Sequence, residues 1–373
     1  MNKDLKVSVI IPSYNHSKFL KQAIDSVLNQ TYKNFELIIV DDASSDNSNE
    51  IIQSYKDERI KSFCFQTNQG AVDTLNYGVL SSDSDYVALL NSDDYWEQNK
   101  LEKQMKYLEN NPQVSCVFTD AYFIDELNNI LKKSDYFWAD AFTQSNKSSG
   151  EWLHQLFYKL NCFCHPSLLI KRSIYSEIGM YDPSFRQLPD FSMWINVIKK
   201  YNIHVMEEKL VYFRILSNEM NTSSVTYKNI IRNKNELFII MDDFFNGISD
   251  EDFIDGFLKD KSSKIYTSDE LECEKAFAYF REISGDIKPI YNLIGLKKLS
   301  KLLNNETTRR ILEEKFNFRD KDFFEMSGSL DIVDVFEKST QQVILDSAKR
   351  KIQKDPNLYS KLKKLFGKQG RKK

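Results

Sequence analysis

The chain has 373 residues, and its 41% hydrophobic and 13% aromatic content supplies a buried core, which excludes a disordered protein. With only 7 Pro and 11 Gly, it is not collagen-like or of low complexity. A net charge of -3 argues against a nucleic-acid partner, and the length predicts two domains at roughly 150 residues each.

Four short apolar runs predict buried strands, over residues 7–11, 35–40, 60–65 and 86–90. Apolar positions at helical spacing predict helices between them, over residues 17–30, 45–55 and 71–80. Ser17 is expected to cap the first of these helices. Strands that alternate with helices indicate an α/β fold with a mainly parallel sheet and helices on both faces.

Polar side chains follow three of these strands where each strand ends. Residues 12–15 follow the first strand, Asp41 and Asp42 follow the second, and residues 91–94 follow the fourth. Open α/β sheets bind ligands outside the carboxyl ends of their strands. We therefore expect these side chains to meet at one edge and to form a nucleotide-sized pocket.

From about residue 114 the pattern changes to strands with longer connections, and after about residue 226 it becomes helical and charged. Strands are expected over residues 168–170 and 211–213, and helices over residues 229–245 and 271–283. These changes predict an α/β domain over residues 1–225, with halves of about 1–112 and 113–225, and a mainly helical domain over residues 226–348.

The last 25 residues, 349–373, form a separate basic segment with 11 Lys or Arg and one acid, Asp355. Leu358, Leu362, Leu365 and Phe366 lie at helical spacing on one face. Such a basic amphipathic segment can bind an anionic membrane surface, and the alternative is a solvated tail.

Membrane spans and secretion are not expected from this sequence. No stretch approaches the ~20 apolar residues of a membrane span, and the first apolar run is too short for a signal peptide. The five cysteines form no regular framework, which fits a reducing compartment. We expect a cytoplasmic protein, held on the inner face of the membrane if the basic segment binds it.

Asp93 and Asp94 are adjacent carboxylates that leave the core at a strand end. Crowding two carboxylates is costly unless a positive group lies beside them. Mg²⁺ or Mn²⁺ suits this position, because these ions use one or two carboxylates together with diphosphate oxygens. At the second strand end, one carboxylate can accept a hydrogen bond from a base edge, and Asp46 or Ser45 can cap the following helix.

Several segments together resemble glycosyltransferase family 2, in order and in spacing, over residues 7–94. They are VSVIIPSYN at 7–15, LNQTY at 28–32, IIVDDAS at 38–44, NQGA at 68–71, LNYG at 75–78 and LNSDD at 90–94. The resemblance implies a GT-A fold, a nucleotide-diphosphate sugar as donor (UDP-sugar first), a divalent cation (Mn²⁺ or Mg²⁺) and inversion at the anomeric carbon.

The resemblance also implies a set of site residues. Asp41 is expected at the base, and Asp93 and Asp94 match the family's metal- and ribose-binding acids, without indicating which of them contacts the ion. The residues expected to bind donor or nucleotide are Pro12, Tyr14, Asn15, Asp41, Asn68, Gly70, Asn76, Asn91, Asp93 and Arg214.

The sequence departs from the family pattern at several positions on the donor side. Asn91 stands where the family often has Asp, Leu75 where it often has Arg, and Leu216 where it commonly has a His that reaches the metal or diphosphate. Arg214, in the same segment, either contacts phosphate or braces the fold. His165 is a candidate substitute for the missing imidazole, near the acceptor.

Residues 179–186 and 189–194 look like the family's acceptor-side segment, which usually reads Glu-Asp-Trp. Asp190 is the matching acid, flanked by Pro189 and Phe191. Direct displacement needs a base for the proton of the acceptor hydroxyl, and the resemblance gives that role to Asp190. Trp194 and His165 are expected on the acceptor side.

The sequence thus predicts an inverting glycosyltransferase that uses a glycan or lipid-linked acceptor, in a bacterial pathway for lipopolysaccharide or another surface polysaccharide. A degenerate relative that only binds nucleotide sugar is the alternative, supported by the substitutions at Leu75, Asn91, Pro189 and Leu216. A sugar nucleotidyltransferase is disfavoured, because no Gly-rich basic loop follows the first strand.

Overall fold

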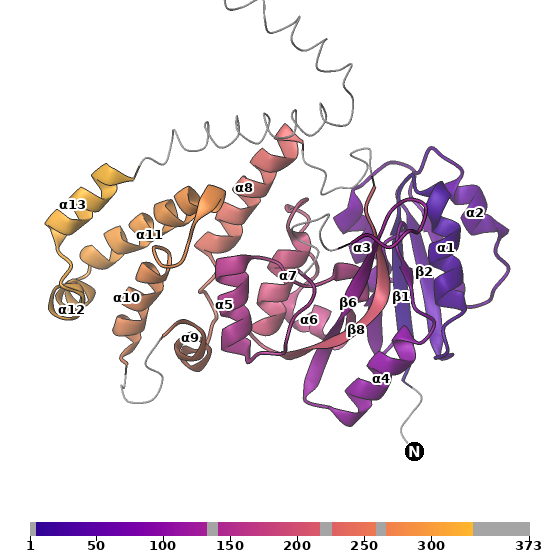
Figure 1. The fold of residues 1–373 in the computed structure, drawn as a ribbon, viewed down its shortest axis with the longest axis horizontal. Coiled ribbons are helices and arrows are strands. Elements are labelled where there is room, and N and C mark those ends of the chain that lie inside the picture. Colours follow the sequence, from indigo (N-terminus) through magenta and orange to yellow (C-terminus); the bar gives the residue numbers. More distant parts are fainter. Residues whose placement is uncertain (1–4, 133–140, 217–225, 259–265, 331–373) are drawn as a thin grey trace, which may run out of the picture. The chain divides into compact units, whose positions relative to one another are not determined.

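The structure, a computed structural model, describes residues 5–132, 141–216, 226–258 and 266–330 (Figure 1). The chain divides into two compact units. The first comprises Met1–Thr222 and Asp243–Lys264, and the second comprises Ser223–Asp242 and Ile265–Lys373. The predicted basic segment, residues 349–373, lies outside the described residues.

The described part of the first unit contains an eight-stranded sheet in the order β3-β2-β1-β4-β7-β6-β8-β5. The strands are β1 (Val7–Ser13), β2 (Phe35–Asp41), β3 (Ile60–Cys64), β4 (Tyr86–Leu89), β5 (Tyr95–Trp96), β6 (Val114–Ile124), β7 (Leu169–Lys171) and β8 (Asn202–Arg214). The pairs β1–β2, β1–β4, β2–β3 and β6–β8 are parallel, and β4–β7, β6–β7 and β5–β8 are antiparallel. The predicted mixed, mainly parallel sheet is confirmed.

Helices cover both faces of this sheet (Figure 1). The helices of the first unit are α1 (Ser17–Leu28), α2 (Ser48–Ser54), α3 (Ala71–Leu80), α4 (Lys100–Asn110), α5 (Ser149–Lys159), α6 (Ser173–Ile178), α7 (Pro189–Ile198) and α9 (Asp250–Phe257), with a short 3-10 helix η2 (His165–Ser167).

Successive side chains of β1 point to opposite faces of the sheet, and this explains which residues pack on each face. Val7 and Val9 share a buried cluster with residues of α1 and α4, whereas Ile10 points to the opposite face. There α3 approaches so closely that a Cβ added at Gly78 would lie 2.4 Å from Cγ2 of Ile10. A glycine is therefore required at this helix–sheet contact.

The predicted cap of the first helix is wrong in its residue. Ser17 is the first helical residue, and its backbone N–H donates to Oδ2 of Asp46 at 2.9 Å. Oδ1 of the same carboxylate accepts from the backbone N–H of Ser48 at 3.0 Å, where α2 begins. One carboxylate thus caps two helix starts, and α2 begins three residues later than expected.

The second unit is helical, in agreement with the predicted helical C-terminal region. Its described helices are α8 (Tyr227–Asp242), α10 (Ser268–Ala278), α11 (Lys288–Leu303), α12 (Glu306–Phe316) and α13 (Asp320–Ser329), with the 3-10 helix η3 (Gly285–Ile287). A separate apolar cluster joins α10, α11 and α12, formed by Cys273, Ala276, Leu299, Leu303, Leu312 and Phe318.

The structure adds one feature to the expected division of the chain: the described residues 243–258 pack with the first unit. Within that segment, α9 crosses α5 at two glycines, where a Cβ on Gly256 would lie 2.1 Å from the carbonyl oxygen of Gly150. In the ranges that the structure describes, no helix is both long enough and apolar enough to cross a membrane.

A buried carboxylate joins β1, β2 and β3. Glu36 is 4% exposed, and its Oε2 lies 3.0 Å from Nζ of Lys6 and 2.7 Å from Nζ of Lys61. The hydroxyl of Ser8, its register partner, donates to Oε1 at 2.6 Å. Burial raises the pKa of Glu36, but the hydrogen bonds from Lys61, Ser8 and Lys6 outweigh it and lower the pKa from 4.5 to about 2.

Replacing Glu36 with Gln should therefore cost stability in a pH-dependent way. The lowered pKa contributes stability above pH 4.5 that is lost as the pH falls towards 2. Urea unfolding should show that Glu36→Gln lowers the free energy of unfolding by roughly 2 kcal/mol near neutral pH, and by progressively less in acid. Glu208→Gln, at the exposed ion pair with Lys103, is the control. An equal cost of Glu36→Gln at every pH would contradict this role.

Candidate active site

The carboxyl ends of β1 and β2 are tied together by a turn. The backbone N–H of Asn15 donates to Oγ of Ser44 at 2.9 Å, and the backbone N–H of Ser45 donates to Oδ1 of Asn15 at 2.8 Å. Asn15 and Ala43 have φ values of 53° and 59°, a region that non-glycine residues adopt infrequently. Backbone strain is thus concentrated where these two strands end.

Asp41, the residue expected at the base, is enclosed in this turn. Its carboxylate is 0% exposed, and it accepts from the backbone N–H of Ser44 at 2.8 Å and from the Ser44 hydroxyl at 2.7 Å. Sγ of Cys64, on the neighbouring strand β3, lies 3.8 Å from Oδ1. In this structure the carboxylate of Asp41 therefore shapes the turn.

Asp42 anchors the loop that precedes α3. Its two carboxylate oxygens accept from the backbone N–H groups of Gln69 at 2.6 Å and Gly70 at 2.9 Å, and its carbonyl accepts from Nδ2 of Asn68 at 3.3 Å. Gly70 has a φ of 100°, which favours glycine. Two of the predicted donor-site residues, Asn68 and Gly70, are thereby held beside the end of β2.

The loop after β4 meets the same edge of the sheet. β4 is parallel to β1, and the backbone N–H of Leu90 donates to the carbonyl of Ile10 at 3.0 Å. Nδ1 of His16 lies 2.7 Å from Oγ of Ser92, which joins this loop to the start of α1. The ends of β1, β2 and β4 therefore converge as predicted.

The two adjacent carboxylates of this loop have different surroundings. Oδ1 of Asp94 accepts from the backbone N–H of Arg214 at 2.7 Å, and Oδ2 accepts from Nδ2 of Asn91 at 2.9 Å. Asp93 is 8% exposed, and no hydrogen bond from another described residue reaches its side chain. Both oxygens of Asp94 are thus occupied by the protein, whereas the carboxylate of Asp93 has no such contact with another described residue.

Arg214 is 1% exposed and braces this loop from the end of β8. Its Nε donates to the carbonyl of Asp93 at 2.7 Å, and its guanidinium carbon lies 4.5 Å from the ring centroid of Phe19. Its other donors reach Asp125 at 2.9 Å, Gln22 at 2.9 Å and Asn128 at 2.8 Å. Of the two roles that the sequence left open, this geometry supports bracing of the fold.

Burial dominates the electrostatics of the carboxylate pair. It raises the pKa of Asp94 well above its usual value, and the charge of Asp93 raises it further. The pKa of Asp93 is also raised by burial, which the positive potential of His16 and Arg214 opposes. A divalent cation beside Asp93 would favour both charged forms, so the residues present fit such an ion.

A metal here would need ligands from outside the protein. Over residues 5–132, 141–216, 226–258 and 266–330, no group of three or more His, Cys, Asp or Glu side chains could hold an ion. Mg²⁺ and Mn²⁺ sites built from one or two carboxylates, substrate phosphates and water are common. Asp93 with a diphosphate satisfies that description.

The second half of the domain, residues 113–225, reaches the same edge through β7 and η2. β7 runs antiparallel to β4, and the backbone N–H of Leu89 donates to the carbonyl of Leu168 at 3.3 Å. Nε1 of Trp96 donates to the carbonyl of Pro166 at 2.8 Å. η2 and its first residue, His165, therefore lie beside the carboxyl end of β4.

Asp190 lies in the first turn of α7, half-buried. Its Oδ1 accepts from the backbone N–H of Phe191 at 2.8 Å, and its Oδ2 accepts from Nδ2 of Asn161 at 2.7 Å. His165 is coupled to it electrostatically: burial lowers the pKa of this imidazole, and the charge of Asp190 partly opposes the shift. The proposed base and its neighbour thus share one environment.

Two predicted site residues serve the framework in this structure. The amide of Asn76 makes two hydrogen bonds with the backbone of Tyr181, at 2.7 and 3.1 Å, which link α3 to the chain ahead of α7. Trp194 is 1% exposed and packs edge-to-face on Phe118 at 4.8 Å. Its buried indole packs α7 against β6 and is not accessible to an acceptor in this structure.

Tyr14 is 46% exposed at the end of β1, and the neighbouring Pro12 is half-buried. An exposed aromatic ring at this position can stack on a base. These two side chains therefore offer an accessible surface at the predicted nucleoside position.

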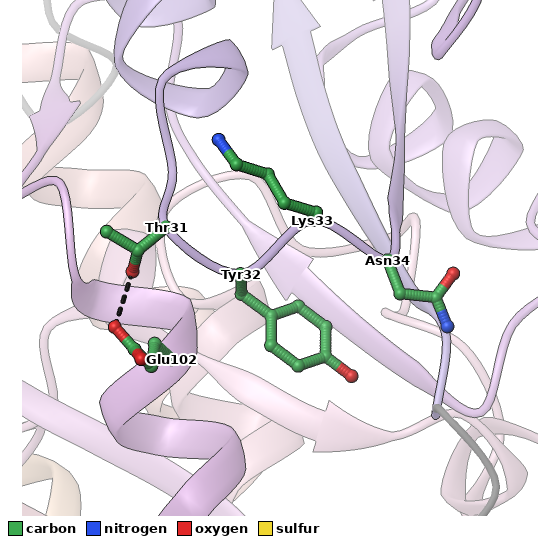
Figure 2. A pocket seen from close by; sticks show the side chains of 5 residues that line it. All are labelled: Thr31, Tyr32, Lys33, Asn34 and Glu102. Carbon is green, nitrogen blue, oxygen red and sulfur yellow. Dashed lines mark hydrogen bonds between the residues drawn. The ribbon is translucent and has the colours of Figure 1, made fainter.

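The structure also has a pocket away from this edge (Figure 2). Its volume is about 510 Å³, and it is lined by Thr31, Tyr32, Lys33, Asn34 and Glu102. Residues 31–34 directly precede β2, so the pocket lies at the amino end of that strand, opposite Asp41. A hydrogen bond of 2.7 Å joins Thr31 to Glu102 across it. It is distinct from the candidate site.

Three residues of the site escaped sequence reasoning: His16, Asn161 and the anchoring carboxylate of Asp42. His16 could have been noticed as a polar residue ahead of a predicted helix. Asn161 carries no local signal, because its contact with Asp190 spans 29 positions.

Comparisons with known proteins place this geometry in a family. The model for glycosyl transferase family 2 matches residues 8–179. An uncharacterized glycosyltransferase of Methanocaldococcus jannaschii is 36% identical over 220 residues, which cover 58% of this chain and 72% of that protein. TuaG of Bacillus subtilis, by its name a teichuronic acid biosynthesis glycosyltransferase, is 31% identical over 222 residues, which cover 58% of this chain and 82% of TuaG.

Other matches extend less far or show the fold alone. An uncharacterized glycosyltransferase of Rickettsia conorii is 31% identical over 66% of this chain, which spans 39% of that protein. Staphylococcus aureus TarS 1-349, solved in complex with UDP-GlcNAc, superposes with a TM-score of 0.54 at 16% identity, over 91% of this chain and 92% of that one. The predicted GT-A fold is confirmed.

Replacing Arg214 with Lys should disturb the Asp93–Asp94 loop. Lysine keeps the charge but lacks the planar group that donates to several acceptors at once. We expect the free energy of unfolding to fall by about 2 kcal/mol or more, because buried acceptors lose their donors. Urea denaturation measures this cost. Arg59→Lys, at the partly exposed pair with Asp57, is the matched control, and an equally small effect of both substitutions would contradict the bracing role.

Proposed function

We propose a donor and a reaction course for this chain, which belongs to glycosyltransferase family 2 and is a glycosyltransferase. The donor that we propose is a UDP-sugar, and the acceptor is a hydroxyl of a glycan or lipid-linked molecule. The observation that carries the proposal is the convergence of three strand ends around one uncommitted carboxylate, Asp93.

The nucleoside is proposed to bind at the ends of β1 and β2. Tyr14 and Pro12 offer an accessible face there, and the loop with Asn68 and Gly70, anchored by Asp42, closes the other side. TarS 1-349, which shares the fold, has been solved with UDP and with UDP-GlcNAc. These complexes support a uridine nucleotide as the first donor to test.

The diphosphate and a divalent cation are proposed to bind at Asp93. When bound, Mn²⁺ or Mg²⁺ would stabilise the negative charge that develops on the departing diphosphate. Asp94 is proposed to act indirectly: its carboxylate accepts from Arg214 and Asn91 and so fixes the loop that presents Asp93.

Asp190 is proposed as the base on the acceptor side. The acceptor oxygen forms a bond to the anomeric carbon as the bond from that carbon to the diphosphate oxygen breaks, and the bonding electron pair leaves with the nucleotide. The hydroxyl proton passes to the carboxylate of Asp190, which requires an approach of about 2.6–3.2 Å. Attack opposite the leaving group inverts the anomeric configuration.

Likeness to TuaG supports an acceptor in bacterial surface-glycan synthesis. From the sequence we further propose that residues 349–373, with 11 basic side chains and one acid, hold the chain on an anionic lipid surface. Each basic residue near such a surface contributes about 1 kcal/mol.

Substitutions at Asp190 and Asp93 should distinguish the proposed role of Asp190 as the base from the proposed role of Asp93 as a metal ligand. Asp190→Asn should reduce turnover of the UDP-sugar at least about 100-fold and leave UDP affinity within a factor of about two, because the base acts only in the transition state. Asp93→Asn should instead weaken Mn²⁺-dependent UDP binding, measured by calorimetry. A screen of UDP- and GDP-sugars with and without Mn²⁺ identifies the donor.

Two results would contradict this assignment. Equal loss of UDP binding in both variants would remove the distinction between base and metal site. Nucleotide binding without turnover of any sugar in the screen would favour the alternative, a relative that binds nucleotide sugar without catalysis.

Membrane attachment is tested separately with vesicles. The full chain should sediment with phosphatidylglycerol-containing vesicles and not with phosphatidylcholine vesicles, and added salt should release it because screening weakens the attraction. A variant ending at residue 348 should stay in the supernatant with turnover of soluble substrate unchanged. Equal sedimentation of both proteins would contradict an anchor in residues 349–373.

A further inference from the structure

The carboxylate of Asp190 is held on both oxygens by the protein. The backbone N–H of Phe191 donates to Oδ1 at 2.8 Å, and the side-chain amide of Asn161 donates to Oδ2 at 2.7 Å. A backbone N–H is available at any helix start, so the first contact is expected of an acid in this position. The second contact comes from a distant part of the chain and is specific to Asn161.

The orientation of the Asn161 amide is fixed at both ends. Its Oδ1 accepts from the backbone N–H of Phe163 at 3.2 Å, so its Nδ2 must face Asp190. An amide held in this way always presents an N–H to the carboxylate. It thereby fixes the direction of Oδ2 of Asp190.

The backbone next to Asn161 is strained. Leu160 follows α5 with φ 64° and ψ −162°, a conformation that is nearly restricted to glycine and unfavourable for leucine. A glycine or a longer connection would relieve this strain. The strained residue directly precedes the amide that contacts the base, which is the pattern expected where geometry serves function.

His165 interacts electrostatically with the same carboxylate. Its ring is edge-to-face with Tyr181 at 5.8 Å and lies 5.9 Å from Trp194, and its buried Nε2 meets no hydrogen-bond partner in the described parts of the chain. Being largely enclosed by aromatic rings, it offers Asp190 no fixed donor. The amide of Asn161 is the side-chain donor that sets the direction of the carboxylate.

We propose that Asn161 is a positioning residue for the general base: its amide orients Oδ2 of Asp190 and keeps the carboxylate ready to accept the proton of the acceptor hydroxyl. This inference rests on the proposed function, because it takes Asp190 as the base. Asn161 does not touch the substrate in this role. It acts through the carboxylate alone.

The test compares kcat and KM of three variants. Asn161→Ala removes the N–H donor, so Oδ2 of Asp190 loses the side-chain contact that fixes its direction. We expect kcat to fall about 10–100-fold with KM for the UDP-sugar within a factor of about two, because the base acts only in the transition state. Asn161→Ser, which keeps a donor hydroxyl, should recover part of the loss.

Asn146→Ala is the matched control, because the Asn146 amide also makes two backbone hydrogen bonds, with Val205 at 2.8 and 2.9 Å, far along the chain from Asp190. It should leave kcat and KM unchanged. An equal loss of kcat in Asn161→Ala, Asn161→Ser and Asn146→Ala would show a general structural defect, and that outcome overturns the proposal.

A readout without turnover separates this inference from the proposed function. The chain has four His, and the ring resonances of His165 can be assigned by a His165→Gln variant. Since His165 senses the charge of Asp190, its chemical shifts should change in Asn161→Ala, where the amide no longer holds that carboxylate. Unchanged His165 chemical shifts in Asn161→Ala would contradict the positioning role of Asn161 and leave the proposed function intact. Full activity of Asp190→Asn would contradict the role of Asp190 as the base.

Discussion

A buried guanidinium holds the candidate site together. Arg214 is the last residue of β8, yet its side chain and backbone bind the loop that follows β4, 120 positions earlier in the chain. Its charge opposes the rise in pKa that burial causes at both carboxylates but does not outweigh it. Because Arg214 and Asn91 occupy Asp94, the neighbouring Asp93 remains available. The asymmetry of an apparently equivalent Asp-Asp pair follows from this one arrangement.

The rest of the site is built on strand ends. Three parallel strands stop at the same edge, and the turns that follow them are cross-linked by Asn15, Ser44, His16 and Ser92. Two of these turns contain non-glycine residues at positive φ. Residues 113–225 reach this edge because β7 pairs antiparallel with β4. The Asn76 amide also links α3 to Tyr181. Donor and acceptor groups can therefore be positioned by one rigid sheet.

Much of the fold was predictable, because it rests on local patterns. Apolar runs predicted β1, β2 and β4, and helical spacing predicted α1 and α3, with differences of a few residues at their ends. Asp46 was a predicted candidate cap for α2, but its second role was not predictable: its carboxylate accepts from the backbone N–H groups at the starts of both α1 and α2, which only the folded turn brings together. Local spacing made Ser17 the natural candidate.

The site was predictable as a set of residues but not as a set of roles. The motifs identified Asp93, Asp94, Arg214 and Asp190, yet whether Arg214 contacts phosphate or protein depends on partners that the sequence does not place. The same holds for Asn161, whose amide reaches Asp190 only because α5 ends in a strained turn. Long-range hydrogen bonds decide these roles, and sequence spacing does not encode them.

The most direct measurement is a crystal structure of the full chain with UDP and Mn²⁺. It should show the ion coordinated by Asp93 and the diphosphate, with Asp94 still bonded to the backbone of Arg214 and with Asp190 facing the same cavity. An ion bound to Asp94 with Asp93 turned away, or a nucleotide bound at a surface that Asp190 does not face, would contradict the claim that Asp93 and Asp190 serve one site at the same edge of the sheet.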